Sequence, residues 1–119
     1  MKLRLLGSGA SREHLTVAIG IFESLGDQRE LARARLNLGT LRRAEGDIDA
    51  AVALHLAVIE YCTDREEAEG LFWALTELAR DEHARGECDT ARRHWDDAHR
   101  LVHRNHLDWV LDRLNPLGG

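Results

Sequence analysis

Apolar residues recur every three or four positions along most of this chain, which is the spacing of amphipathic α-helices. Glycines followed by acidic residues interrupt the pattern at Gly26-Asp27, Gly46-Asp47 and Gly86-Glu87. Glycine commonly ends a helix, and an acidic side chain commonly caps the helix that follows. The pattern therefore predicts helices joined by turns so short that neighbouring helices must be antiparallel.

Six helices are expected, in four segments: a helix over 11–25, a hairpin over 27–63, a hairpin over 64–104 and a closing helix over 106–114. Ser11 is the expected N-cap of the first helix. Thr63 and Asp64 each stand three residues before a glutamate, which is the spacing of a capping box. Either residue is therefore a possible start for the second hairpin.

The two hairpins resemble each other at a fixed offset of forty residues. Seven of forty positions are identical at this offset: Leu31/Leu71, Ala34/Ala74, Leu38/Leu78, Ala44/Ala84, Gly46/Gly86, Asp49/Asp89 and Ala51/Ala91. A fixed period of 20–50 residues is typical of solenoid proteins, in which stacked hairpins share a continuous core. We therefore expect one all-α domain over residues 1–119, of a kind that usually binds a partner rather than transforming a substrate.

Composition narrows the possible partners. The chain has 119 residues and a net charge of −5, which argues against nucleic acid as the main partner. No apolar run approaches the roughly 20 residues that a membrane span needs. Cys62 and Cys88 lack a CxxC spacing, and two lone thiols suit a reducing compartment. We expect a cytoplasmic protein without a cofactor.

Three stretches resemble the tetratricopeptide repeat in its longer version, as seen in kinesin light chains and in bacterial antibiotic-regulatory and NTPase-linked regulators. They are Leu25-Gly26-Asp27-Gln28-Arg29, Leu36-Asn37-Leu38-Gly39 and Glu45-Gly46-Asp47. Residues 11–25 look like the second helix of a preceding partial repeat. The resemblance covers roughly residues 11–104. It implies a right-handed solenoid, and it weakens at Leu78-Ala79 and Thr63-Asp64, where the glycines are missing.

The resemblance also implies a concave groove, lined by the first helix of each repeat, that binds a peptide or a partner helix. Carried over by position, the groove residues are Arg33, Leu36, Asn37, Thr40, Arg43, Trp73, Thr76, Glu77, Arg80 and His83. Arginine, histidine and tryptophan side chains favour an acidic or aromatic segment. Glu77 departs from the asparagine common in the family and weakens this inference. The alternative is that all ten are ordinary solvated helix residues.

The remaining aromatic and cysteine residues carry separate expectations. Trp73 is the tryptophan expected to be functional. Trp95 stands where such repeats place a bulky packing residue, so we expect it in the core. Trp109 would anchor the closing helix. Cys88 replaces the Ile48 of the first repeat, which predicts a packed and inert thiol.

Metal and acid–base chemistry are the weaker interpretations. Asp96, His99 and His103 are one turn apart and could converge on zinc, and His106 follows three residues later. A chain with seven histidines produces such spacing by chance, so no metal is expected. Adjacent pairs such as Glu82-His83 point apart on a helix and make no catalytic dyad.

Three functions therefore remain as hypotheses. The first is a non-catalytic protein–protein interaction module, with a possible homodimer through the solenoid ends. The second is the sensor or oligomerisation part of a bacterial transcriptional or signalling regulator. The third is a small metal-binding or enzymatic helical domain.

Overall fold

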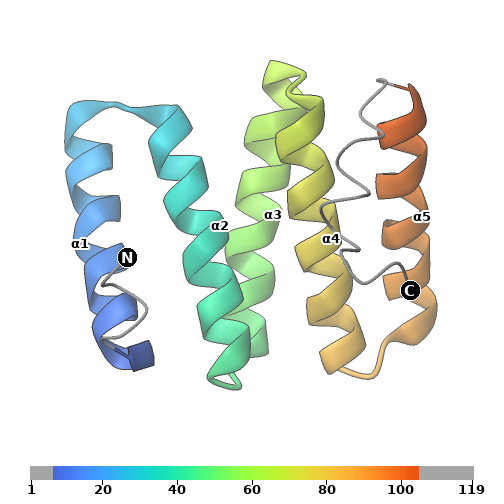
Figure 1. Cartoon of the computed structure of the whole chain (residues 1–119), viewed down its shortest axis with the longest axis horizontal. Coiled ribbons are helices and arrows are strands. Elements are labelled where there is room, and N and C mark those ends of the chain that lie inside the picture. The colour runs from blue at the N-terminus through green and yellow to red at the C-terminus, as the bar shows by residue number, and fades with distance from the viewer. Residues whose placement is uncertain (1–6, 105–119) are drawn as a thin grey trace. The chain divides into compact units, whose positions relative to one another are not determined.

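The computed structural model describes residues 7–104, and these are helical apart from short turns (Figure 1). The helices are α1 (Gly7–Leu25), α2 (Gln28–Ala44), α3 (Ile48–Arg65), α4 (Ala68–Ala84) and α5 (Cys88–Arg104). The all-α class is confirmed, and the described residues contain no strand. The closing helix expected over 106–114, together with His106 and Trp109, lies outside the described residues.

The chain divides into two compact units, Met1–Val58 and Ile59–Gly119, and α3 contributes to both. None of the helices in the described range is long and apolar enough to cross a membrane.

Four turns repeat the same geometry every twenty residues. Residues 26, 46, 66 and 86 each have a positive φ, of 70°, 91°, 55° and 86°. After each of them, the next backbone N–H bonds to the carbonyl five residues before it, as in Asp27 to Phe22 and Glu87 to Glu82. This is the Schellman arrangement, which satisfies carbonyls at a helix end. The helix ends expected at the three glycines are confirmed.

The expected start of the second hairpin at Thr63 or Asp64 is wrong. Helix α3 continues to Arg65, and α4 begins after Glu67, which makes no side-chain capping bond. Glu66 takes the left-handed conformation that Gly26 takes forty residues earlier. This turn therefore follows the twenty-residue period of the other turns and not the local capping signal.

The expected N-cap of the first helix is also wrong. Helix α1 already begins at Gly7, so Ser11 lies within it.

In the first unit, α1 packs against α2, and α2 approaches α3 closely at Gly39. The ring of His55 on α3 is fully buried, and its Nε2 lies 3.3 Å from the carbonyl oxygen of Leu36. A Cβ on Gly39 would lie 2.5 Å from that Nε2. Glycine is therefore required at this position for His55 to pack.

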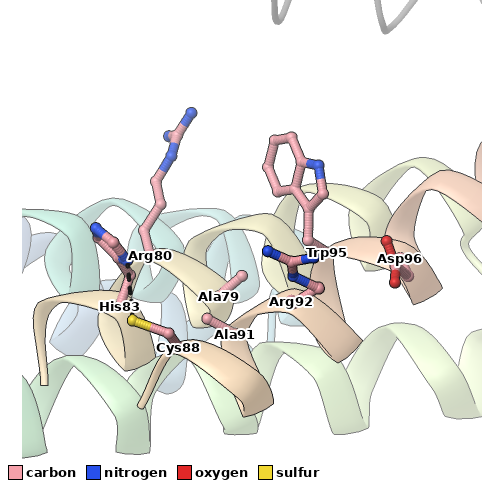
Figure 2. A pocket seen from close by; sticks show the side chains of 8 residues that line it. All are labelled: Ala79, Arg80, His83, Cys88, Ala91, Arg92, Trp95 and Asp96. Carbon is pink, nitrogen blue, oxygen red and sulfur yellow. Dashed lines mark hydrogen bonds between the residues drawn. The ribbon is translucent and has the colours of Figure 1, made fainter. Parts of the chain in front are cut away.

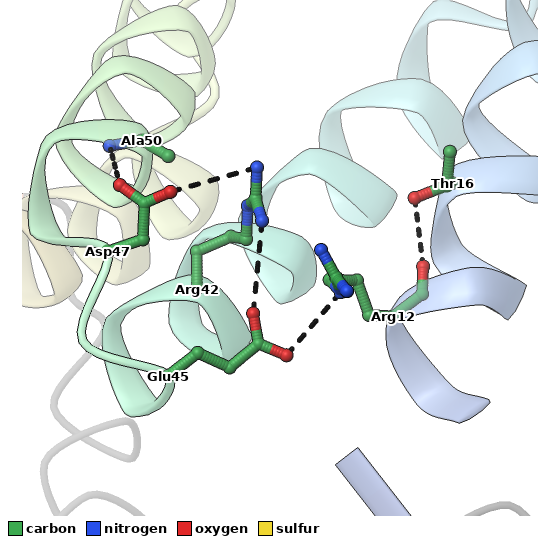
Figure 3. A network of polar contacts seen from close by, with 6 residues as sticks. All are labelled: Arg12, Thr16, Arg42, Glu45, Asp47 and Ala50. Atoms are coloured by element: carbon green, nitrogen blue, oxygen red, sulfur yellow. Dashed lines mark hydrogen bonds and ion pairs between the residues drawn. The ribbon is translucent and has the colours of Figure 1, made fainter. Parts of the chain in front are cut away.

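A polar network joins the first turns of α1 to the turn after α2 (Figure 3). Glu45 lies 3.5 Å from Arg12 and 3.9 Å from Arg42, and Arg42 lies 3.8 Å from Asp47. Asp47 also caps α3 by accepting a hydrogen bond from the N–H of Ala50 at 3.2 Å. Partly exposed ion pairs of this kind stabilise little individually. The network pairs each arginine with an acidic residue at this end of the unit and adds little to its stability.

The core of the second unit is built by α4 and α5. Phe72, Ala98 and Val102 are fully buried, and partly buried Trp73, Leu75 and Leu101 pack against them. Glu82 on α4 is almost fully buried, and its Oε1 lies 2.7 Å from Nδ1 of His94 on α5. An apolar cluster and a polar contact therefore hold these two helices together.

Candidate functional site

An open hollow of about 760 Å³ lies between α4 and α5 (Figure 2). Its lining comes from the last turns of α4 and the first half of α5: Ala79, Arg80, His83, Cys88, Ala91, Arg92, Trp95 and Asp96. All eight residues belong to the second unit.

The floor of the hollow is apolar. Ala79 and Ala91 are buried, and their short side chains leave space between the helices. Trp95 is half-buried and lines the hollow, and Figure 2 shows its indole rising from α5 above these two alanines. Large aromatic side chains in such positions supply much of the contact area when a partner binds. The floor therefore suits apolar side chains of a ligand.

The two hairpins differ at two equivalent positions that line the hollow in the second hairpin. The positions of Ala79 and Trp95 correspond, forty residues earlier, to Gly39 and His55. His55 is fully buried because Gly39 has no Cβ, whereas Ala79 carries a Cβ and Trp95 stays half-buried. Part of the indole of Trp95 is therefore at the surface, whereas the ring of His55 is fully buried.

The rim of the hollow carries more positive than negative charge. Arg80 and Arg92 are exposed, and Asp96 is the acidic residue among the eight. One nitrogen of Arg80 bonds to a carboxylate oxygen of Glu77 at 2.9 Å, which leaves other guanidinium donors available. Guanidinium groups bind carboxylates through paired, charge-assisted hydrogen bonds. The rim therefore suits an acidic ligand.

His83 and Cys88 form the end of the hollow that lies next to the turn. Nδ1 of His83 lies 3.9 Å from Sγ of Cys88, and Figure 2 shows the two side chains facing each other. Cys88 is exposed. The expectation of a packed Cys88 is wrong, because its side chain is exposed at the first residue of α5, whereas Ile48 is partly buried at the first residue of α3.

Two aromatic side chains, His99 and Phe72, form a row of ring contacts with Trp95. The ring centroids of Trp95 and His99 are 4.8 Å apart, and Phe72 contacts His99 edge-on at 6.5 Å. Nδ1 of His99 lies 3.0 Å from the carbonyl oxygen of Trp95. Trp95 was expected in the core, and the structure places it only partly there. His99 therefore links the indole of Trp95 to the apolar cluster around Phe72.

The five groove residues expected on α4 have different environments. Arg80 and His83 line the hollow. Trp73 is half-buried and packs edge-on against Phe72, with centroids 5.0 Å apart. Glu77 is almost fully buried beside Arg80. Thr76 is fully buried, so its side chain cannot contact a partner in this conformation.

The five groove residues expected on α2 belong to the first unit. Arg33 and Asn37 are exposed, whereas Leu36, Thr40 and Arg43 are half-buried. The hydroxyl of Thr40 donates to the carbonyl of Leu36 at 3.2 Å, which occupies its proton within the helix. Arg33 and Asn37 are therefore the most accessible of these five residues.

The sequence interpretation missed the residues that α5 contributes to the hollow. Ala91, Arg92 and Trp95 lie on the second helix of the repeat, whereas the resemblance directs attention to the first. One signal could have found them. The pairing of Gly39 with His55 changes to Ala79 with Trp95 at an offset of forty, and such a paired change marks altered packing.

The suggested metal ligands do not converge. Among residues 12–104, no group of three or more histidine, cysteine, aspartate or glutamate side chains could hold a metal ion. His99 contacts Trp95 and Phe72 instead of Asp96. We therefore base no proposal on Asp96, His99 and His103.

Comparison with known proteins gives no assignment. No family model, no curated protein and no solved structure matches the chain. The hollow and the surfaces of the individual helices are therefore the features that indicate a function.

Proposed function

We propose that this protein is a non-catalytic protein–protein interaction module, and that the hollow between α4 and α5 binds an acidic amphipathic peptide or partner helix. The observation that carries the proposal is the combination of an apolar floor with a positively charged rim. An amphipathic helix has the complementary arrangement, with apolar residues on one face and charged residues beside them.

The floor and the rim have separate roles in this proposal. Leucine-like side chains of the ligand pack on Ala79, Ala91 and Trp95 and supply most of the affinity. Carboxylates beside them pair with Arg80 and Arg92 and fix the direction of the ligand. The ligand thus resembles the acidic segment that the sequence suggested, but it contacts α5 as well as α4.

For the fold, we propose a tetratricopeptide-like right-handed solenoid, and for the location the cytoplasm. Three observations support the repeat architecture: the forty-residue resemblance between hairpins, the positive-φ turn every twenty residues, and small residues at Ala51, Ala91 and Ala98 on the second helices. Proteins of this architecture act mainly through binding surfaces.

The test is peptide binding measured by fluorescence anisotropy. The probes are two labelled helical peptides with the same leucine pattern, one with glutamates and one with lysines beside the leucines. The glutamate peptide should bind, and the lysine peptide should bind at least about tenfold more weakly, since one charge-assisted contact is worth about 1.5 kcal/mol.

Two variants locate the binding surface. Arg92→Glu and Trp95→Ala should each weaken binding of the glutamate peptide by about tenfold or more. Arg93→Glu is the matched control, because Arg93 is exposed on the same helix, bonds to Thr90 at 3.5 Å and does not line the hollow. If Arg93→Glu weakens binding as much as Arg92→Glu does, net charge and not the hollow governs binding, and the proposal fails.

A second candidate function is oligomerisation, which is favoured by three exposed apolar side chains on α1: Val17, Ile21 and Leu25.

A further inference from the structure

The end of the hollow next to the turn carries a thiol and an imidazole that face each other (Figure 2). Cys88 is exposed at the first residue of α5, and its Sγ lies 3.9 Å from Nδ1 of His83 in the last turn of α4. The thiolate, and not the thiol, is the nucleophile in sulfur chemistry, and a neighbouring base can take the proton. The two helices thus place a nucleophile and a proton acceptor in contact at an accessible position.

The shape of the turn does not require this pair. In the first hairpin, the equivalent positions hold Arg43 and Ile48, and the turn between them has the same backbone geometry. The thiol and the imidazole are therefore a feature of the second hairpin alone. Cys62, the other cysteine, is buried, so Cys88 is the accessible thiol of the two.

A ligand that reaches Cys88 through the hollow meets two guanidinium groups. Arg80 on α4 and Arg92 on α5 both line the hollow and are exposed. The hollow has a volume of about 760 Å³, which is within the range of roughly 300–1,000 Å³ for small-molecule sites. Glu87 and Asp89 flank Cys88 in the sequence, but neither lines the hollow. The hollow therefore favours a small ligand that carries carboxylates.

We propose that Cys88 is a modification site that exchanges with a small disulfide carrying carboxylates, with His83 as the base and the rim arginines, Arg80 and Arg92, as the groups that attract the ligand. Nδ1 of His83 takes the thiol proton, and the sulfur of Cys88 attacks one sulfur of the small disulfide. A new S–S bond forms as the S–S bond of the ligand breaks, and the leaving sulfur takes the electron pair and then the proton. Cys88 is oxidised and one half of the ligand is reduced to a thiol, so no other oxidant is needed.

The experiment follows modification of the folded chain by mass spectrometry at low ionic strength. The probes are glutathione disulfide, which carries carboxylates and a net negative charge, and 2-hydroxyethyl disulfide, which is uncharged. Cys88 should gain one glutathionyl group, and buried Cys62 should stay unmodified. The readout is the mass at each thiol, so the result does not depend on whether the hollow binds the glutamate peptide.

Arg92→Glu tests the role of the rim. The ratio of the rate with glutathione disulfide to the rate with the uncharged disulfide should fall about threefold or more, because the reversed charge repels the carboxylates. Arg93→Glu is the matched control, since it changes the net charge equally on the same helix but Arg93 does not line the hollow. It should leave the ratio close to that of the wild type.

His83→Gln tests the role of the base. At neutral pH, this variant should react at least about threefold more slowly with both disulfides, since the base acts on the thiol and not on the ligand. At about pH 10, where an exposed thiol loses its proton to solvent, the variant and the wild type should react at the same rate. His83, Arg92 and Arg93 are all exposed, so none of the substitutions should disturb the core.

Three results would overturn the inference. The first is a Cys88 that glutathione disulfide leaves unmodified or modifies no faster than Cys62. The second is a rate ratio that Arg92→Glu lowers no more than Arg93→Glu does. The third is a His83→Gln variant that reacts as fast as the wild type at neutral pH, or that stays equally slow at about pH 10, because the latter would indicate a structural effect of the substitution.

Discussion

Two glycines within helices, Gly39 and Gly70, have a packing role. A Cβ on Gly39 would lie 2.5 Å from His55 Nε2, and one on Gly70 would lie 2.7 Å from Cys62 Sγ. Glycine lowers helix stability by about 1 kcal/mol relative to alanine. That cost is offset here by the buried side chain for which each glycine makes room.

We predict that Gly39→Ala destabilises the protein despite the higher helix propensity of alanine. Overpacking a filled core costs about 1–3 kcal/mol, which outweighs the gain in propensity. Urea unfolding of Gly39→Ala, His55→Ala and the double variant measures how far the effects of the two substitutions depend on each other. In the His55→Ala background, Gly39→Ala should leave the free energy of unfolding unchanged or raise it. An equal cost in both backgrounds would rule out the contact as the cause.

The Cys62 thiol gives a prediction for alkaline pH. Burial and, to a smaller extent, the negative charge of Glu67 raise the pKa of this thiol above its ordinary value of 9.0. Below about pH 9, the thiol keeps its proton in both the folded and the unfolded state. As the pH rises further, the unfolded state releases it first, so the free energy of unfolding falls. Stability should thus decrease from about pH 9 up to the raised pKa.

The control for this prediction is Cys62→Ala, which should lower stability at neutral pH but remove the alkaline decrease that the thiol causes. Native alkylation followed by mass spectrometry offers a second check, because exposed Cys88 should be modified and buried Cys62 should not. Rapid modification of both thiols in the folded protein would contradict the burial of Cys62.

At the level of the helices, hydrophobic spacing predicted the all-α class and the helical segments that the structure describes. The three glycine stops fixed the ends of α1, α2 and α4, because a left-handed residue there satisfies the last carbonyls. The end of α3 was not predictable in this way, because Glu66 adopts the same conformation without being glycine. Thr63 and Asp64 offered a better local cap, but α3 continues past both residues to Arg65.

We predict that Glu66→Gly stabilises the protein by about 1 kcal/mol, because a side chain in the left-handed region costs roughly that amount. Glu66→Ala is the control, since alanine carries the same Cβ, and it should change stability little. The midpoint of urea unfolding reports both variants. A Glu66→Gly midpoint at or below that of the wild type would show that φ at this position is not strained.

The candidate site was less predictable than the helices. Arg80 and His83 followed from the repeat position alone, because their place on the first helix does not depend on fine packing. Arg92 and Trp95 did not, because they lie on α5, the second helix of the repeat, whereas the resemblance places groove residues on the first. The exposure of a residue on α5 depends on how that helix packs against α4, and the spacing of apolar residues alone does not determine this packing.

For the molecule as a whole, the charged rim of the hollow gives a salt dependence. Arg80 and Arg92 are exposed at this rim in the second unit. Added salt should therefore weaken binding of the glutamate peptide, because it screens the attraction between exposed opposite charges. Binding of the same strength at low and at high salt would contradict a role for the arginines.

Binding at the hollow is tested most directly by an NMR titration of the isotope-labelled chain with the glutamate peptide. We predict that chemical-shift changes concentrate on the indole N–H of Trp95, the methyl groups of Ala79 and Ala91, and the amides of α5 near Arg92. Changes concentrated on Arg33 and Asn37 of α2, or no changes at peptide concentrations near millimolar, would contradict binding at the hollow.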